Sequence, residues 1–425
     1  MSKGYRAALL RFDGDGQAQR IEDALLVVDA GRIADVGDFA AVSARHPALE
    51  VHDWRGLTLA PGFVDVHVHY PQLDVIASPA TGLLPWLENY TFPQEARFSD
   101  PLHAAAVSEL FLDELARHGV TTAMVYCTSH PQSADAFFEA ARRRRLRMVA
   151  GKCLMDRHCP DAVRDDTELG LAQSARLIER WHGVDRLGYA LTPRFAPSCS
   201  ERQLAGAAEL ARAHPGVWVQ THVAENHDEI AWVARLFPDA RSYLDVYERF
   251  GLLRPRSMYA HCIHLDPQDR SRMAACGAAA AVCPTSNLFL GSGLFDFDAA
   301  EQAGFAWGLA SDVGGGTSFS PFRTMLAAYE VARLRGITLS PSSLWFRHTL
   351  GAAQAMDLGE RIGNLQVGME ADFVALDACA TPLLARRTAI AWTLEEWLFA
   401  LIVLGDDRVI RHTVVLGEPA VVSAR

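Results

Sequence analysis

Closely spaced cysteine pairs and long apolar runs are both missing from this sequence of 425 residues. Its eight cysteines include no C-x-x-C pair, the spacing of many zinc and redox centres, so we expect reduced and mostly buried thiols. No apolar run reaches the roughly 20 residues that span a bilayer. The N-terminus carries too short an apolar stretch for a signal peptide. These absences predict a cytoplasmic protein with no membrane partner.

Positive charge is also in deficit, because 40 Lys and Arg residues stand against 51 Asp and Glu residues, for a formal net charge of −11. This balance makes nucleic acids and anionic membranes poor partners. The one basic run, Arg142 to Arg145, follows a helical pattern and is expected to form a solvated helix end. Half of the residues are hydrophobic, so the chain can bury a sizeable core.

Strand patterns alternate with amphipathic helical patterns through most of the chain, which predicts repeated βα units and a parallel sheet. Eight strands are expected at 61–69, 121–127, 147–153, 187–192, 217–222, 257–261, 279–283 and 305–312. Helices are expected at 135–145, 172–181, 201–213 and 329–334. Eight such units over roughly three hundred residues match the size of a (β/α)8 TIM barrel.

Short β patterns at both ends of the chain predict a second, smaller domain. The turn Asp29-Ala30-Gly31 indicates a hairpin near the start, and β runs return after residue 363 and again near Gly417. We therefore expect a discontinuous β-sandwich. Residues 1–58 form its first part, 59–362 form the barrel, and 363–425 return to the β-sandwich with room for a helical insertion.

The first barrel strand ends in two histidines one residue apart. Period-two alternation places Val64, Val66 and Val68 on one face and His67 and His69 on the other. Two imidazoles aimed together are half of a site for a divalent metal. Further candidate site residues follow other strands, and a barrel brings the carboxyl ends of its strands to one mouth. These residues are Arg194, Phe195, His222, Glu225, His261 and Asp312.

Several segments carry a family resemblance. The chain resembles the amidohydrolase superfamily in Pro-Gly-Phe-Val-Asp-Val-His-Val-His (61–69), His222, His261 and Ser311-Asp312. Within it, four segments look like the guanine deaminases: His69-Tyr70-Pro71-Gln72, Trp86-Leu87 with Tyr90-Thr91-Phe92-Pro93, Thr192-Pro193-Arg194-Phe195-Ala196-Pro197 and Cys283-Pro284-Thr285-Ser286-Asn287-Leu288. The resemblance runs from about residue 59 to the C-terminus. It implies a homodimeric enzyme that hydrolyses guanine to xanthine and ammonia in purine catabolism.

The resemblance also implies the metal site. It assigns one Zn²⁺ per subunit, with iron as the alternative, to His67, His69, His222 and Asp312. Binuclear relatives place a carboxylated lysine at the end of the fourth strand, which has no counterpart in 187–194, so Lys152 on the third strand is interpreted as structural.

Hydrolysis at C2 of guanine needs a nucleophile and a proton shuttle. A bound zinc lowers the pKa of water from about 15.7 toward 7, so metal-bound hydroxide becomes available to attack C2. Asp312 would ligate the metal and accept a hydrogen bond from the water, and His261 would orient it. Glu225, three residues after His222, is the candidate that moves the proton to N3 and to the leaving amino group.

Residues of the substrate pocket follow from the acceptors that guanine presents. The guanidinium fork of Arg194 fits the O6 and N7 atoms, and adenine carries a donor at C6 instead. Gln72 would contact the remaining edge of the base and Phe195 its face. His222 and Glu225 complete the predicted substrate-binding set.

Alternatives stay open at this point. Another amino-heterocycle, such as 8-oxoguanine, a pterin or an aminotriazine, needs the same ligands, and a non-catalytic scaffold of the same fold is a further reading. Glu225 is also interpretable as a helix N-terminal carboxylate, and Arg194 as the partner of an acidic loop residue. Gly314 to Gly316 predict a loop beside Asp312 and not a phosphate loop, because no Gly-Lys-Ser/Thr follows. A zinc deaminase of the P-C-x-x-C type is excluded, since that cysteine pair is missing.

Overall fold

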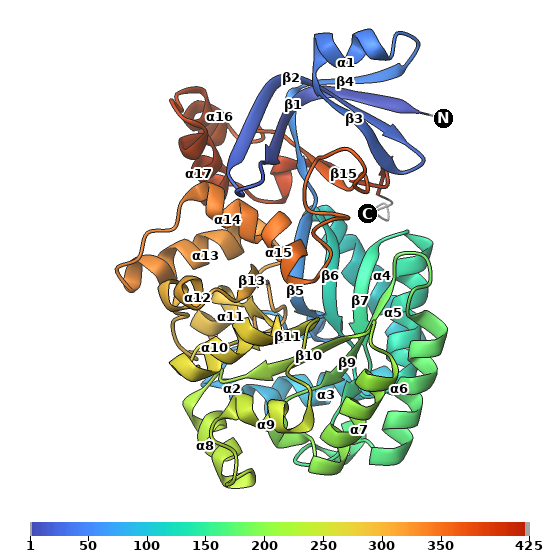
Figure 1. Cartoon of the computed structure of the whole chain (residues 1–425), viewed down its shortest axis with the longest axis vertical. Helices are drawn as coiled ribbons and strands as arrows, with labels where there is room; N and C mark the ends of the chain where they lie inside the picture. Colours follow the sequence, from blue (N-terminus) through green and yellow to red (C-terminus); the bar gives the residue numbers. More distant parts are fainter. Residues whose placement is uncertain (1, 421–425) are drawn as a thin grey trace.

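A barrel of eight parallel strands dominates the computed structural model, which describes residues 2–420 (Figure 1). Around the barrel the strands are β5 (Phe63–His69), β6 (Val120–Tyr126), β7 (Arg147–Gly151), β9 (Gly188–Pro193), β10 (Trp218–Val223), β11 (Ser257–His261), β12 (Ala279–Val282) and β13 (Ala306–Leu309). A two-residue strand, β8 (Cys153–Leu154), also pairs with β9. All eight predicted strands are present, although the eighth ends at Leu309 and not at 312.

The barrel closes through main-chain hydrogen bonds between β5 and the segment that follows β13. The Asp312 amide donates to the His67 carbonyl (3.0 Å), and the His69 amide donates to the Val313 carbonyl (2.9 Å). The first and last βα units are therefore joined at the level of the two histidines.

An irregularity in β5 changes which side chains face the barrel interior. Val64 and Val66 pack in the apolar cluster inside the barrel, whereas Val68 packs in the outer cluster beneath the helices. The expectation that all three valines share one face was wrong. The register of β5 against β6 shifts between Asp65 and Val68, where three steps along β5 match two along β6, and such a bulge reverses the alternation.

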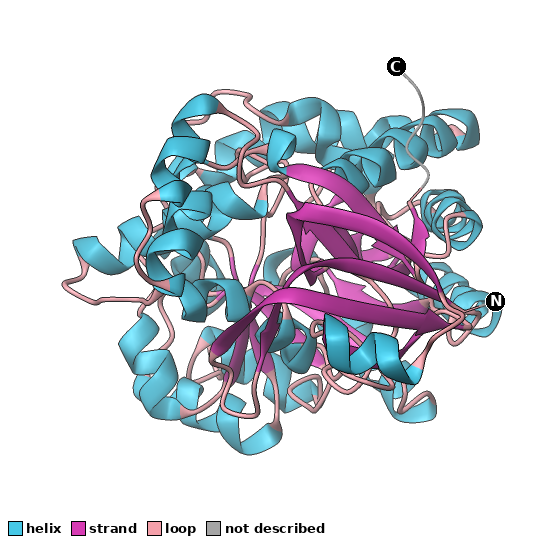
Figure 2. Ribbon diagram, turned by 90° about the horizontal axis from the view of Figure 1, so that it is seen from above, coloured by secondary structure: helices cyan, strands magenta, loops and turns pink. Residues whose placement is uncertain are grey.

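Helices surround the barrel, as seen from above in Figure 2. They are α4 (Pro101–Arg117), α5 (Pro131–Arg143), α6 (Thr167–Trp181), α7 (Glu201–Ala213), α8 (His227–Leu236), α9 (Tyr243–Phe250), α10 (Pro267–Cys276), α11 (Pro284–Phe289), α12 (Phe297–Ala303), α13 (Pro321–Leu334), α14 (Pro341–Arg347) and α15 (Leu350–Ala355). The four predicted helices overlap α5, α6, α7 and α13.

A helical covering segment between β5 and α4 lies at the end of the barrel that faces away from the small sheet (Figure 1). Its elements are η1 (Tyr70–Val75), α2 (Leu83–Trp86), η2 (Leu87–Thr91), α3 (Phe92–Ala96) and η3 (Arg97–Ser99). The carboxyl ends of the barrel strands point to this end, so the covering segment forms part of the mouth.

Both chain ends build one continuous mixed sheet of seven strands at the opposite end of the barrel (Figure 1). In sheet order the strands are β16 (Glu418–Pro419), β15 (Ile410–Val415), β14 (Phe373–Leu376), β4 (Glu50–Pro61), β1 (Lys3–Phe12), β2 (Ala18–Asp29) and β3 (Arg32–Asp38). The three remaining helices are α1 (Phe39–Arg45), which follows β3, and α16 (Pro382–Ala389) and α17 (Leu394–Leu404), which lie between β14 and β15. The predicted barrel with a smaller β domain built from both chain ends is confirmed, the small domain being one continuous sheet, and α16 and α17 lie where the helical insertion was expected.

The predicted N-terminal hairpin is confirmed in detail. Asp29 pairs with Arg32, and the two turn residues have φ values of 47° at Ala30 and 79° at Gly31. Two consecutive positive φ angles define the tight turn that suits twisted hairpins. The predicted domain boundaries stay predictions: β4 continues past residue 58, and residues 1 and 421–425 lie outside the described part of the chain.

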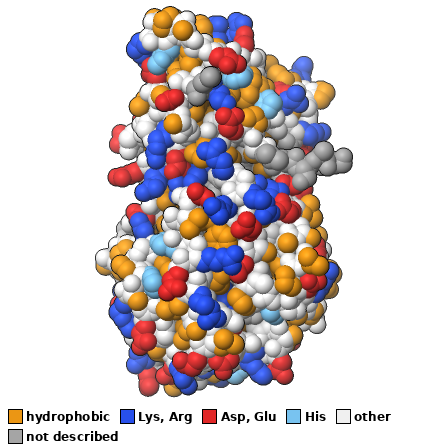
Figure 3. Space-filling model, turned by 90° about the vertical axis from the view of Figure 1, so that its right-hand side faces the viewer, with side chains coloured by type: hydrophobic (Ala, Val, Ile, Leu, Met, Phe, Trp, Pro, Cys, Tyr) orange, Lys and Arg blue, Asp and Glu red, His pale blue; other side chains and the backbone are white. Residues whose placement is uncertain are grey.

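Charged residues are mixed on the molecular surface. On the face in Figure 3, basic and acidic side chains are interspersed over both parts of the molecule. Within residues 2–420 no helix combines the length and apolarity needed to cross a membrane. The exclusion of nucleic acids and membranes as partners stays a prediction from the net charge.

Four buried charged side chains join the barrel to the small sheet. Glu370 accepts a hydrogen bond from Arg147 Nε (2.9 Å) and lies 2.7 Å from Arg186 Nη2, and Arg186 also bonds Asp372 (3.2 Å). Arg147 begins β7 and Arg186 precedes β9, so the network lies at the amino end of the barrel strands. Buried charges need such pairing, because an unpaired ion in a low-dielectric interior is costly.

We expect Glu370→Gln to lower the free energy of unfolding by about 3 kcal/mol, because two buried guanidinium groups lose a shared carboxylate. Denaturant unfolding followed by circular dichroism measures this. Glu168→Gln is the control, because its partner Arg202 is exposed and such surface pairs contribute below about 1 kcal/mol. Equal stability of the two variants would show that the network does not hold the two parts together.

Candidate metal centre and active site

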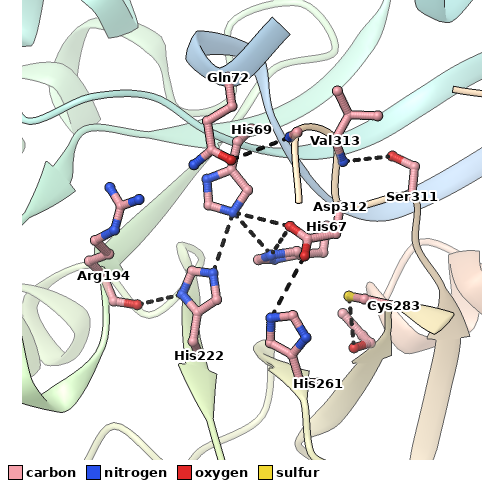
Figure 4. A network of polar contacts seen from close by, with 12 residues as sticks. His67, His69, Gln72, Arg194, His222, His261, Cys283, Ser311, Asp312 and Val313 are labelled. Carbon is pink, nitrogen blue, oxygen red and sulfur yellow. Dashed lines mark hydrogen bonds and ion pairs between the residues drawn. The ribbon is translucent and has the colours of Figure 1, made fainter. Parts of the chain in front are cut away.

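Three imidazole nitrogens and one carboxylate oxygen converge at the mouth of the barrel (Figure 4). His69 Nε2 lies 3.1 Å from His67 Nε2 and 3.3 Å from His222 Nε2. Asp312 Oδ1 lies 3.1 Å from His67 Nε2 and 3.4 Å from His69 Nε2. A tetrahedral ion with bonds of about 2.1 Å holds its ligand atoms roughly 3.4 Å apart. Four of the six distances among the predicted ligand atoms are therefore close to the spacing that one divalent ion needs.

The protonation states of these groups suit metal binding. Burial lowers the pKa of His69 and His222 well below the ordinary histidine value, so both imidazoles are neutral. Burial raises the pKa of Asp312, but nearby His67 and His261 outweigh it and bring it to about 2. His222 Nδ1 lies 2.6 Å from the Arg194 carbonyl oxygen. Nδ1 therefore carries the proton, and Nε2 keeps its lone pair for a metal.

A second group of potential donors includes a cysteine. Cys283 Sγ lies within 4.8 Å of donor atoms from three residues, namely His67, His261 and Asp312. Burial raises the pKa of the Cys283 thiol well above its ordinary value, and Sγ donates to the Ala281 carbonyl (3.4 Å). Because the thiolate is the form that binds metals, Cys283 is a poor ligand and the histidine set is the better site.

Local backbone strain accompanies the site. Asp312 and His261 have φ values of 50° and 70°, a left-handed region that costs residues other than glycine about 1–3 kcal/mol. Asp65 stabilises this region, because its carboxylate accepts hydrogen bonds from the Ser311 amide (3.1 Å) and the His67 amide (3.2 Å). Ser311, the residue before Asp312, is thus tied to β5 through Asp65.

Glu225 and His261 face each other beside the four donors. Glu225 Oε2 lies 3.3 Å from His261 Nε2, and Glu225 Oε1 accepts from the Ser292 hydroxyl (2.9 Å). His261 Nδ1 donates to Asn287 Oδ1 (2.8 Å), which turns Nε2 toward Glu225 and Asp312. Burial raises the pKa of Glu225. Burial lowers the pKa of His261, but Glu225 and Asp312 outweigh it and raise it.

Glu225 does not cap the helix that follows it. Asn226 is the N-cap of α8, and Glu229 accepts from the amides of Glu225 (3.1 Å) and Asn226 (3.3 Å). The carboxylate of Glu225 is therefore free of the capping role that the sequence left open. His264, the next histidine along the chain after His261, makes a different contact: its Nε2 lies 2.9 Å from the Ser292 carbonyl oxygen.

One pocket joins the donor set to the residues predicted to bind a substrate. Its empty space is about 420 Å³, including solvent at the mouth. The lining residues are His69, Gln72, Leu83, Trp86, Leu87, Arg194, Phe195, His222, Glu225, Glu229, His261, Leu290, Asp312 and Gly315. His67 lies behind this surface. All other predicted site residues reach the pocket.

Arg194 pairs with an acidic residue, which was the alternative to substrate binding that the sequence allowed. Its Nη1 lies 2.6 Å from Glu95 Oε2, and both side chains are buried. The pairing leaves Arg194 on the pocket wall. Gln72 also contacts Glu95 (3.2 Å), and Phe195 packs edge-on against Trp232 with ring centroids 6.1 Å apart.

The three glycines after Asp312 and Val313 are needed for close packing. A Cβ at Gly316 would lie 1.7 Å from the Ser311 carbonyl oxygen, and one at Gly314 would lie 2.5 Å from the Gln72 carbonyl oxygen. The loop lies beside Asp312 as predicted, and Gly315 lines the pocket.

Sequence reasoning missed several residues that shape the site. Glu95 lies in a helical covering segment and not after a strand, so no pattern distinguished it. Trp86 received no role from the sequence, yet it lines the pocket, and its indole N–H has no hydrogen-bond partner in the part of the chain that the structure describes. Asn287 and Trp86 both lie in segments that carried the family resemblance. The family resemblance of these segments was therefore the only feature of the sequence that pointed to the two residues.

Comparisons with known proteins agree on one family. The model of the Amidohydrolase family matches residues 58–420, and an imidazolonepropionase-like composite domain matches only residues 26–48. Guanine deaminase of Escherichia coli is 44% identical over 97% of this chain and 92% of that enzyme.

Two solved structures are similar over nearly the whole chain. Guanine deaminase from Bradyrhizobium japonicum superposes with a TM-score of 0.97 at 33% identity, covering 100% of both chains. Guanine deaminase from C. acetobutylicum, with bound guanine in the active site, superposes with a TM-score of 0.92 at 27% identity, covering 99% of this chain and 100% of that one.

We expect His222→Ala to lower metal affinity more than about tenfold, because it removes one of four donors. Metal analysis after dialysis against a buffered metal solution measures the loss. Thermal melting with and without a chelator should show that the variant no longer gains stability from metal. His264→Ala is the matched control, and unchanged metal content in His222→Ala would contradict the assignment of this donor set.

Proposed function

The chain belongs to the amidohydrolase family, and from that premise we propose that it hydrolyses guanine to xanthine and ammonia. The similar full-length enzymes named above are guanine deaminases. The observation that carries the proposal is one pocket that unites a metal donor set, a buried carboxyl group and a guanidinium fork. The family and the activity expected from the sequence motifs agree with these comparisons.

We assign one zinc ion to His67, His69, His222 and Asp312, with iron as the alternative. Three neutral imidazoles and one carboxylate form a typical zinc donor set that leaves a position for water. When bound, the ion lowers the pKa of that water from about 15.7 toward 7.

Glu225 moves the protons of the reaction. The reaction adds water across C2 of guanine, and N3 must gain a proton because the ring loses aromaticity. Burial raises the pKa of Glu225, which brings its carboxyl group closer to neutral pH, where a group that both accepts and donates a proton works best. Ser292 holds one carboxylate oxygen, and the other faces His261. Glu225 takes one proton from water and delivers it to N3 as the oxygen bonds to C2. It then takes the second proton from the hydroxyl group on C2 and passes it to the amino group, which leaves as ammonia when the C2–N bond breaks.

His261 and Asp312 orient the water. The His261 Nδ1 proton is held by Asn287, so the ring presents Nε2 to the reacting centre. Asp312 Oδ2 lies 3.8 Å from that nitrogen, on the side away from its contact with His67. A hydrogen bond from water to Asp312 and one to His261 would align the lone pair with C2.

Arg194 reads the base. One guanidinium N–H is held by Glu95, and the remaining donors are available to the O6 and N7 acceptors of guanine. Adenine would place its C6 amino donor against them and leave both groups unpaired. Phe195, Leu87 and Leu290 supply apolar surface for the faces of the ring.

The alternatives differ in strength. Another amino-heterocycle would use the same donors and Glu225, so Gln72 and Arg194 decide among substrates. A non-catalytic scaffold is disfavoured because the sequence retains every predicted donor and the similar full-length enzymes are guanine deaminases. The homodimer, the cytoplasmic location and the role in purine catabolism stay predictions.

Purified, zinc-loaded protein should convert guanine to xanthine with one ammonia released per guanine. Absorbance of guanine and coupled ammonia detection follow the reaction, with adenine, 8-oxoguanine and a pterin in parallel. If the protein deaminated another heterocycle and not guanine, the assignment of the metal site would stand, but the assignment of guanine as the substrate would be wrong.

Glu225→Gln should lower kcat by about 100-fold to 10,000-fold, because the amide cannot shuttle a proton. Metal content and melting temperature should stay near those of the wild type. Asp228→Asn, an exposed carboxylate three residues along the chain, is the matched control and should keep full activity. A Glu225→Gln enzyme with kcat within a factor of about three of wild type would remove Glu225 from the mechanism.

A further inference from the structure

Glu95 of α3 connects the two polar side chains predicted to read the base. Its Oε1 accepts a hydrogen bond from Gln72 Nε2 (3.2 Å), and its Oε2 accepts one from Arg194 Nη1 (2.6 Å). Glu95 is 1% exposed and is absent from the residues that line the pocket. It therefore acts through its two partners and does not touch a ligand.

We propose that Glu95 is a positioning residue that makes the pocket select a 6-oxo over a 6-amino purine, by fixing the direction of the hydrogen bonds that Gln72 and Arg194 offer. The inference rests on the proposed function. It adds a residue that no sequence pattern singled out.

The orientation of the Gln72 amide follows from its two neighbours. Nε2 faces the carboxylate of Glu95, and Oε1 faces the main-chain amide of Gly314 (3.3 Å). A flipped amide would place an oxygen against a carboxylate oxygen and an N–H against the N–H of Gly314. Both contacts would be repulsive, so only one orientation is compatible with these partners. Nε2 keeps one further N–H to donate.

Arg194 is fixed by the same carboxylate. The Arg194 guanidinium lies between Glu95 and the ring of Phe92, whose centroid is 5.2 Å from Cζ. Burial lowers the pKa of Arg194, but the charge of Glu95 outweighs it and raises it, so the group is always charged. The Glu95 charge balances the guanidinium, which allows this part of the pocket to take a neutral base.

Both side chains therefore present N–H donors beside Glu95. An acceptor on the ligand, such as the O6 atom of guanine, completes these hydrogen bonds. An amino group at the same position brings donor against donor. With glutamine at position 95 the Gln72 amide loses one of the two contacts that fix its orientation. Arg194, which can only donate, loses the carboxylate that holds its guanidinium in place. The two donors are then no longer fixed toward an acceptor on the ligand, so the preference for an acceptor over an amino group weakens.

The decisive comparison uses guanine and 2,6-diaminopurine, which share the reacting 2-amino group and differ at C6 and in the N1 proton that accompanies the 6-oxo group. We expect Glu95→Gln to lower kcat/KM for guanine by about 100-fold and for 2,6-diaminopurine by less than about tenfold. The ratio of kcat/KM for guanine to kcat/KM for 2,6-diaminopurine should therefore fall at least tenfold. Inhibition constants for hypoxanthine and adenine give the same comparison without turnover and should converge likewise.

If Glu95 had a purely structural role, Glu95→Gln would lower kcat/KM for guanine and for 2,6-diaminopurine by the same factor. The ratio of the two kcat/KM values and the ratio of the two inhibition constants would then stay at the wild-type values. That outcome would overturn the inference. If the wild type does not deaminate guanine, the proposed function itself fails, which is a separate result seen before any variant is made.

Two further variants keep the test decisive. Glu88→Gln removes the same charge from the same covering segment at an exposed position outside the catalytic pocket, and it should keep the wild-type ratios. Glu95→Asp retains the charge beside Arg194 but is one methylene shorter, so it cannot hold both partners. If Glu95→Gln does not fold, we expect Glu95→Asp to narrow the ratios severalfold, and unchanged ratios in this variant would also overturn the inference.

Discussion

The closure of the barrel between β5 and the segment after β13 is the contact on which the site depends. The amide of Asp312 donates to the carbonyl of His67, and the amide of His69 donates to the carbonyl of Val313. These bonds bring an aspartate close to two histidines that are more than two hundred residues away in the chain. His222 then completes the set from the opposite wall. Without this closure the chain holds only the two histidines of one strand in place.

Burial and pairing together determine the state of the charged groups at both ends of the barrel. At the amino end of the barrel, Glu370 compensates Arg147 and Arg186 and joins the barrel to the small sheet. At the mouth, burial keeps His69 and His222 neutral, while Glu95 compensates Arg194. The same physical rule gives stability at one end and selective binding at the other, because a buried ion persists only with a partner. The two ends are separated by the strands, so changes at one need not disturb the other.

Local sequence patterns predicted the fold well wherever one rule decided the outcome. The eight strands were found because strands buried on both faces are short apolar runs bounded by turns. The Ala30-Gly31 turn required two positive φ angles, and the hairpin followed. Sequence patterns gave the wrong side-chain face or the wrong strand end where pairing with a neighbouring strand decided the outcome. Val68 departed from its expected face because β5 bulges against β6. The last barrel strand ended at Leu309, because its pairing with β12 stops there.

The sequence by itself determined which side chains the site has available. His67 and His69 share a face because they are two residues apart in a strand, and His222, His261 and Asp312 follow strands that end at one mouth. Tertiary structure alone decided that Cys283 stays a thiol, that Glu225 faces His261 instead of capping α8, and that Glu95 holds Gln72 and Arg194. Those outcomes depend on distances and burial between residues far apart in the chain. Such contacts exist only once the barrel has closed, and periodicity along one segment carries no information about them.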